Sequence, residues 1–100
     1  MLVRRWQAEA APTHEIIRSA FENDDLQSEM ETLEPGDYQT DHRHPFEEVR
    51  QIMEGQLLLN ISGNKLLLRP GDRIEIPANT RHSVKCDGGA RCISLIAYRA

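Results

Sequence analysis

A block of twenty residues near the middle of the chain constrains its fold and its chemistry more than any other feature. The block begins and ends with glycine and carries three metal-binding side chains in between: Gly36, His42, His44, Glu48 and Gly55. Imidazole and carboxylate groups are typical donors to a catalytic divalent metal. Glycine favours tight turns because it adopts left-handed backbone angles without strain. The block therefore predicts strands bounded by turns, with a metal site between the turns.

A second, shorter fragment lies farther along the chain and adds a fourth donor. Gly71 is followed by Pro77 and then by His82, with five and four residues between them. Alternate side chains of a strand share one face, so we expect His42 and His44 on the same side of one strand. Three neutral imidazoles and one carboxylate would leave octahedral positions open on a divalent ion, whereas a closed tetrahedral site would indicate structural zinc.

Short runs with strand character follow one another from residue 26 to the end of the chain. The expected strands are Leu26–Leu33, Leu57–Ile61, Lys65–Leu68, Arg73–Ile76, His82–Cys86 and Arg91–Tyr98. We expect the first of them at a sheet edge, and turn residues separate them all. Before these strands, Thr13 can cap a short helix whose apolar side chains recur at helical spacing up to Phe21. The pattern predicts an all-β sandwich or barrel with a short N-terminal helical segment.

The two fragments resemble the two conserved motifs of the cupin superfamily, in their glycines as well as in their metal-binding side chains. The resemblance implies a jelly-roll β-barrel as a single domain over residues 26–100, with residues 1–25 as an added segment that packs on the barrel or on a second subunit. It also implies the four metal ligands, which would be His42, His44, Glu48 and His82. Glu47 falls one residue short of the family spacing. The ligand set admits one divalent ion, which could be iron, manganese, nickel, copper or zinc.

The second fragment departs from the family pattern at two positions, neither of which is an expected ligand. Asn79 stands where a glycine is usual, and asparagine tolerates the left-handed backbone conformation better than most residues do. Cys86 stands where an asparagine is usual, four residues past His82 and thus on the same strand face. We interpret Cys86 as a small buried hydrophobic residue, and the alternative is a soft neighbour of the metal. Cys92 and Tyr98 share a face of the last strand and are further candidates for the pocket.

Strand alternation also predicts which other side chains surround the metal site. Every second residue before His42 and after Glu48 should share the interior face with them. These residues are Tyr38, Thr40, Arg50 and Ile52. An arginine near the metal could bind a substrate carboxylate through two parallel hydrogen bonds. The alternative for Arg50 is an ion pair with Glu75 or Glu54 at the mouth of the barrel. Arg50 and Tyr38 are therefore the expected catalytic residues, which would orient a small anionic or enolisable substrate.

Composition excludes several classes of partner. The formal net charge is −4 and the sequence pI is about 5.5, whereas nucleic-acid-binding domains are usually basic. No nucleic acid is therefore expected as a partner. No run approaches the ~20 apolar residues of a membrane-spanning helix, and no apolar run follows the basic start, so no membrane association is expected. Two cysteines imply no disulfide framework, and we expect a cytoplasmic protein.

Two leucine triplets bear on the oligomeric state. Leu57–Leu59 and Leu66–Leu68 are apolar at every position, which is typical of strands that are buried on both faces. A small barrel has only one interior, so we expect the N-terminal segment or a second subunit to cover the outer face. The chain is therefore expected to form a homodimer, in keeping with the resemblance to small cupins.

For function, the resemblance implies a divalent-metal-binding protein, and in the first place a metal-dependent enzyme that acts on a small organic substrate. Dioxygenase chemistry is the leading expectation, because open coordination positions suit a substrate and dioxygen side by side. A metal-dependent isomerase or decarboxylase would use the same site, and fold analogy does not separate these reactions. The remaining alternative is a non-catalytic module that binds or senses a small ligand or a metal.

Overall fold

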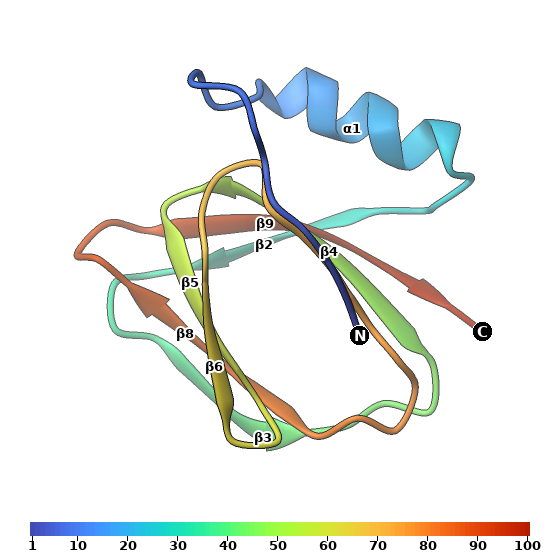
Figure 1. The fold of residues 1–100 in the computed structure, drawn as a ribbon, viewed down its shortest axis with the longest axis vertical. Coiled ribbons are helices and arrows are strands. Elements are labelled where there is room, and N and C mark those ends of the chain that lie inside the picture. The colour runs from blue at the N-terminus through green and yellow to red at the C-terminus, as the bar shows by residue number, and fades with distance from the viewer.

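The computed structural model describes residues 1–100 and contains nine strands and one helix (Figure 1). Their bounds are β1 (Leu2–Arg4), α1 (His14–Asn23), β2 (Glu29–Leu33), β3 (Tyr38–His42), β4 (Glu47–Glu54), β5 (Gln56–Ile61), β6 (Asn64–Leu68), β7 (Arg73–Ile76), β8 (His82–Asp87) and β9 (Cys92–Arg99). The predicted all-β class with a short N-terminal helix is confirmed. The single helix has neither the length nor the apolar character to cross a membrane.

The strands form two antiparallel sheets. One sheet has the order β1-β7-β4-β9-β2, and the other has the order β3-β8-β5-β6. Figure 1 shows the strands surrounding a common interior, with α1 lying outside it. Hydrogen bonding does not continue from one sheet to the other. The expected barrel is therefore a jelly roll of two facing sheets rather than one closed cylinder.

The N-terminal part differs from expectation in two places. The first expected strand begins at Glu29 rather than at Leu26, because Leu26 is buried beside the helix and its N–H donates to the Phe21 carbonyl at 2.9 Å. This strand is an edge strand as predicted, since β2 pairs only with β9. The segment Leu2–Arg4, for which no strand was predicted, forms β1 at the opposite edge of the same sheet and pairs with β7.

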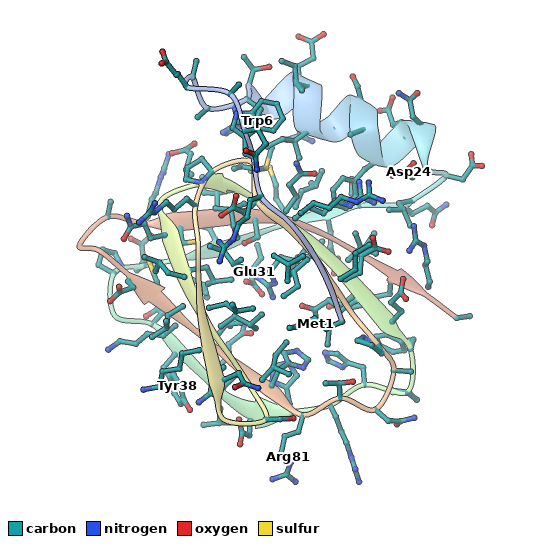
Figure 2. All side chains as sticks on the ribbon, viewed as in Figure 1. Met1, Trp6, Asp24, Glu31, Tyr38 and Arg81 are labelled. Carbon is teal, nitrogen blue, oxygen red and sulfur yellow. The ribbon has the colours of Figure 1, made fainter.

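One apolar cluster lies between the sheets, where Figure 2 shows side chains in the space that the strands enclose. Its buried residues are Leu33, Ile52, Leu57, Leu59, Ile61, Leu68, Ile74, Ile76, Val84, Cys86 and Cys92. Cys86 is thus a buried hydrophobic residue, as interpreted from the sequence. Leu58 and Leu67 pair with each other on the outer side of their sheet and are only half-buried. The prediction that both leucine triplets are buried on both faces is therefore wrong at their centres.

The helix covers the outer face of the five-stranded sheet. Thr13 caps it as predicted, with its side-chain oxygen accepting a hydrogen bond from a first-turn N–H at 3.2 Å. Ile17 and Phe21 join a second buried cluster, whose other members are Leu26, Val49, Met53, Ile93, Leu95 and Ala97. Arg73 holds the C-terminal end of the helix through an ion pair with Asp24 at 2.9 Å and lies 5.0 Å from the ring centre of Phe21. This outer face is therefore covered within one chain.

Candidate metal centre

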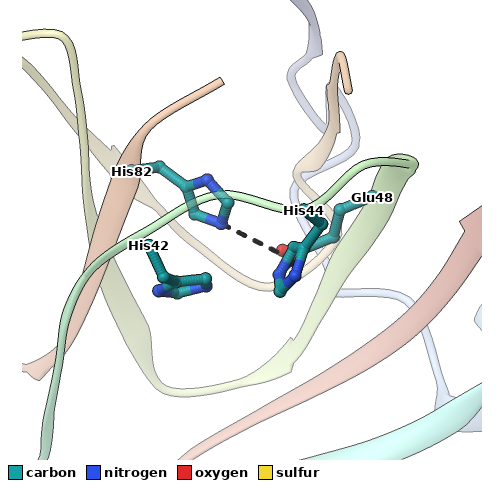
Figure 3. A group of neighbouring side chains, drawn as sticks. All are labelled: His42, His44, Glu48 and His82. Carbon is teal, nitrogen blue, oxygen red and sulfur yellow. Dashed lines mark ion pairs between the residues drawn. The ribbon is translucent and has the colours of Figure 1, made fainter. Parts of the chain in front are cut away.

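Four side chains from separate parts of the chain meet at one end of the space between the sheets (Figure 3). His42 ends β3 and lies opposite His82 at the start of β8, whereas Glu48 comes from β4 in the other sheet. His44 lies in the connection between β3 and β4, and not on a strand with His42 as expected. One potential ligand atom from each residue lies within 4.8 Å of the other three. The structure therefore brings together all four residues that the resemblance selects.

The connection between β7 and β8 holds His44 in place. The N–H of Asn79 donates to the carbonyl oxygen of His44 at 2.6 Å. Asn79 has a φ of 59°, the left-handed conformation that asparagine tolerates in place of glycine. Phe46 stacks on the His44 imidazole, with ring centres 5.0 Å apart and planes inclined by 6°. These contacts orient the ring although no strand does so.

Two backbone carbonyls set the ring orientation and the tautomer of two of the histidines. Nδ1 of His42 lies 2.9 Å from the Thr40 carbonyl oxygen, and Nδ1 of His82 lies 2.9 Å from the Thr80 carbonyl oxygen. A carbonyl can only accept, so Nδ1 of each ring carries the hydrogen and Nε2 presents a lone pair to the centre. The same second contact orients the imidazole in most histidine–metal sites.

The nitrogen of His82 that faces the centre is buried and has no hydrogen-bond partner. This Nε2 lies 3.6 Å from Oε1 of Glu48, and Nε2 of His44 lies 3.4 Å from the same oxygen. Both distances exceed the usual range of about 2.7–3.2 Å for N–H···O hydrogen bonds. Buried lone pairs that face a carboxylate oxygen are compensated only when a proton or a cation lies between them. The residues therefore fit a divalent metal ion.

Electrostatic interactions keep Glu48 ionised. Burial alone would raise its pKa, but the nearby His82 and the guanidinium of Arg50 outweigh burial and lower the pKa to about 2. Burial also opposes a charge on His82, yet Glu48 and the Thr80 carbonyl raise the pKa of that imidazole. Burial is the main cause that lowers the pKa of His44. A fixed negative charge beside imidazoles is an arrangement that attracts a cation.

Arg50 is the buried counter-ion of this centre, with only 2% of its surface exposed. Its Nε donates to Oε2 of Glu48 at 3.1 Å. Its Nη1 donates to Oε1 of Glu31 at 2.6 Å and to the hydroxyl of Ser94 at 3.2 Å. Because Arg50 engages Oε2 of Glu48, Oε1 is the oxygen that faces the histidines.

Two alternatives raised by the sequence are not realised. The predicted ion pair of Arg50 with Glu75 or Glu54 does not form, because those carboxylates contact other basic side chains. Arg99 bridges Glu75 and Glu47, at 2.6 Å from each. Glu47, the rival of the expected ligand, is therefore engaged outside the centre.

An irregularity in β3 changes which of its side chains face inward. Gln39 lies opposite the buried Val84, and the next regular pair is His42 with His82. Two residues of β3 but only one of β8 lie between these two pairs. One extra residue reverses the alternation of side chains. Gln39 therefore shares the interior face, and the prediction that Tyr38 and Thr40 do so is wrong. Tyr38 is 57% exposed.

A cavity of about 520 Å³ lies over the centre. It is lined by Glu31, Tyr38, Gln39, Thr40, His42, His44, Glu48, Arg50 and Tyr98. Tyr38 and Thr40 contribute at its mouth, whereas Glu31 and Gln39, joined by a 3.2 Å hydrogen bond, were missed from the sequence. Glu31 lies two residues before the buried Leu33, so alternation along β2 could have placed it inside. No comparable signal marks Gln39, because the bulge is invisible in the sequence.

One wall of the cavity is aromatic. The ring centre of Tyr98 lies 5.6 Å from that of His44 and 4.7 Å from that of Phe46. Tyr98 thus lines the pocket as one of the further candidates, while Cys92 on the same strand lies in the core. Burial is the main cause that raises the pKa of the Tyr98 phenol, which therefore stays neutral at physiological pH.

Comparison with known proteins places the strands that carry the metal centre in a known family. Residues 29–98 match the family described as Cupin domain. Quercetin 2,3-dioxygenase from Bacillus subtilis is 40% identical over 53 residues, which are 52% of this chain and 16% of that protein. Acireductone dioxygenase from Bacillus licheniformis is 40% identical over 50 residues, which are 45% of this chain and 28% of that protein. The chain thus spans less than a third of the length of these curated relatives.

A solved structure shares the fold at lower sequence identity. An RmlC-like cupin from Shewanella frigidimarina superposes with a TM-score of 0.66 at 22% identity. The match covers 73% of this chain and 64% of that one. At this identity the likeness bears on the two-sheet jelly roll and not on the reaction.

Proposed function

This chain belongs to the cupin family, and we propose that it is a metal-dependent enzyme acting on a small organic substrate, with dioxygenase chemistry as the first candidate. The observation that carries the proposal is the convergence of three histidines and a carboxylate beneath an accessible cavity. A volume of about 520 Å³ falls within the range of about 300–1,000 Å³ that is usual for small-molecule sites. Two curated relatives are named as dioxygenases, which supports this choice among metal-dependent reactions.

In this proposal one divalent ion binds to His42, His44, Glu48 and His82. Three nitrogen donors and one oxygen donor suit iron, manganese, nickel, copper or zinc. When bound, the ion would supply a Lewis acid and, if redox-active, a path for electrons to dioxygen. Arg50 supports the site by engaging Oε2 of Glu48, which leaves a single oxygen for the ion and keeps further positions free for substrate.

The charges of the cavity favour an anionic substrate. Arg50 is the one permanent cation that pairs with Glu31 and Glu48, so with neutral histidines these side chains together carry one net negative charge. A divalent ion would turn that into one net positive charge. A substrate carboxylate or enolate would then neutralise the cavity, because opposite charges attract.

Orientation of the substrate is assigned to three groups that reach the cavity. Arg50 uses Nε and Nη1 within the protein, which leaves the N–H groups of Nη2 to donate to a substrate oxygen. Tyr38 would contact the substrate from the mouth. Tyr98 offers an aromatic wall for a planar substrate, since aromatic rings stack or pack edge to face with such groups.

A metal-dependent isomerase or decarboxylase, and a non-catalytic module that binds or senses a small ligand or metal, are the competing functions. All of them would use the same four ligands, so the reaction is distinguished by oxygen consumption. We propose measuring oxygen uptake with a panel of small carbonyl, thiol and catechol compounds. Uptake that depends on one of these compounds supports the dioxygenase, whereas metal-containing protein without uptake supports the isomerase, the decarboxylase or the binder.

The metal site itself is tested by elemental analysis of purified protein. About one metal ion per chain is expected for the wild type, and His44→Ala should lose it while remaining folded. His14→Ala is the matched control, because His14 is half-exposed at the start of α1 and pairs with Glu54 outside the centre. Full metal content in His44→Ala, or an equal loss in His14→Ala, would contradict the assignment.

We further propose that the chain works as a cytoplasmic homodimer. Leu58 lies half-exposed on the outer side of the four-stranded sheet, and a second copy would remove this apolar side chain from water. The two free cysteines fit a reducing compartment. Light scattering during size-exclusion chromatography should give twice the chain mass of 11.4 kDa. A single species at the chain mass would contradict the dimer.

A further inference from the structure

A second cavity of about 730 Å³ lies away from the metal centre, between residues 5–11 and the segment formed by β6 and its connection to β7. Its lining includes Arg5, Trp6, Glu9, Lys65, Arg69 and Asp72, and it shares no residue with the first cavity. Figure 2 shows Trp6 on the N-terminal segment near α1, whereas Arg81 lies at the opposite end of the molecule. Residues 5–11 also lie outside the segment that matches the family. One wall of the cavity is therefore formed by residues outside the shared domain, and the opposite wall by residues within it.

The N-terminal wall of this cavity is held by a buried carboxylate. Asp72 accepts hydrogen bonds from Nη1 of Arg5 at 2.8 Å, from the N–H of Trp6 at 2.9 Å and from the N–H of Arg69 at 3.0 Å. Nη1 of Arg5 also donates to the Leu67 carbonyl at 2.6 Å. Charge-assisted hydrogen bonds of this kind are about twice as strong as neutral ones. These hydrogen bonds attach the N-terminal segment to β6 and to the connection between β6 and β7.

The indole of Trp6 is also seated by shape. A Cβ at Gly71 would lie 2.5 Å from Cγ of Trp6, so only glycine leaves room for the indole. Nε1 of Trp6 donates to the Ala10 carbonyl at 2.8 Å, which closes the segment on itself. The indole therefore forms a wall of the cavity in a defined position. A ligand in the cavity would contact the indole and replace the water around it.

The charged groups of the cavity leave two cations without a partner. Arg5 and Asp72 form an ion pair with each other. Lys65 and Arg69 form no ion pair, and Glu9 is the only other acidic group in the lining. The lining is therefore net positive, although the chain as a whole carries a charge of −4. The remaining walls are largely apolar.

We propose that this second cavity binds a small aromatic carboxylate, with its ring against Trp6 and its carboxylate between Lys65 and Arg69. The volume lies within the range of about 300–1,000 Å³ that is usual for small-molecule sites. The apolar walls would bury the ring, and the two unpaired cations would bind the negative charge. The proposal goes beyond the metal-dependent reaction, because it needs neither the metal nor its ligands.

The test uses the single tryptophan of the chain as the probe. Benzoate should change the fluorescence of Trp6 in a saturable way, and neutral benzamide of the same shape should bind more weakly. Arg69→Gln and Lys65→Gln should each raise the Kd for benzoate by about threefold to tenfold, as expected for the loss of one charged hydrogen bond. Both side chains are exposed, so these variants should fold. Arg81→Gln, an exposed arginine far from the cavity, is the matched control and should bind as the wild type does.

Several outcomes would overturn the proposal. One is the absence of saturable binding, and another is equal binding of benzoate and benzamide. A Kd that Arg69→Gln and Lys65→Gln leave unchanged, or that Arg81→Gln raises equally, would also do so. Metal-free His44→Ala should bind benzoate with the wild-type Kd, because the metal centre lies elsewhere. Loss of binding in that variant would show that the carboxylate occupies the metal centre and not this cavity.

Discussion

Replacement of Arg50 by methionine would reveal how far the metal centre depends on its buried charges. Methionine preserves most of the apolar stem but removes the guanidinium, which is the counter-ion of Glu48 and Glu31. Glu48 is 2% exposed and cannot turn toward water without moving β4. The pKa of Glu48 should therefore rise from about 2, and the free energy of unfolding should fall.

The size of this loss follows from two arguments that agree. Removing one partner of a buried ion pair costs about 3–5 kcal/mol. Separately, a carboxyl whose pKa is lowered from 4.5 to about 2 is stabilised by roughly 3 kcal/mol, at about 1.4 kcal/mol per unit, and this is an upper limit for Arg50 because His82 is the largest cause that lowers the pKa. We expect Arg50→Met to cost about 3 kcal/mol, which for a domain of this length lowers Tm by about 12–24 °C.

Thermal unfolding of the metal-free protein, followed by circular dichroism at neutral pH, measures this loss. Arg99→Met is the matched control, because Arg99 also contacts two carboxylates at 2.6 Å but is 40% exposed. Exposed pairs contribute at most about 1 kcal/mol, so its Tm should change little. A loss for Arg50→Met no larger than that for Arg99→Met would refute the reasoning, since the buried carboxylates would then need no counter-ion.

Three further outcomes are expected. Phe21 is fully buried between α1 and the sheet, so Phe21→Ala should lower the free energy of unfolding by about 3–5 kcal/mol in a urea titration. Gly55 has a φ of 77°, and a Cβ there would overlap the carbonyl oxygen of Arg91, so Gly55→Ala should lower the free energy of unfolding more in the same titration than Gly63→Ala, where the space is open. Burial would raise the pKa of Asp72, but hydrogen bonds from neighbouring N–H groups outweigh it and lower the pKa below 3.8. Asp72 therefore stabilises the fold above that pH and loses this effect as the pH falls through its folded pKa, so the difference in unfolding free energy between wild type and Asp72→Asn should shrink in acid; a constant difference would contradict this.

Elements that depend on neighbouring residues were predicted well. The short helix was expected because Thr13 can cap it and its apolar residues recur at helical spacing, and both features are present. Most strand positions followed from the turn residues between them, as the hairpin between β5 and β6 illustrates. These signals are local, since they depend on backbone angles and on side chains a few residues apart.

Predictions about faces failed where they relied on unbroken alternation. His44 was assigned to the strand of His42, but the chain leaves β3 before reaching it. Tyr38 was placed inside, and the extra residue in β3 moved Gln39 there instead. Arg50 was placed inside correctly, although its two carboxylate partners were not foreseen. One of these partners, Glu31, comes from a strand that pairs with β9 and not with β4.

The sequence by itself determined the kinds of group that this protein can use: where the chain turns, where the helix starts, and which side chains carry metal-binding atoms. Each of these follows from the chemistry of single residues and their near neighbours. Only the tertiary structure decided which groups face one another, as in the engagement of Glu48 by Arg50 and the seating of Trp6 on Gly71. The reason is that register belongs to two strands together, and a shift of one residue exchanges the side chains that point inward for those that point outward.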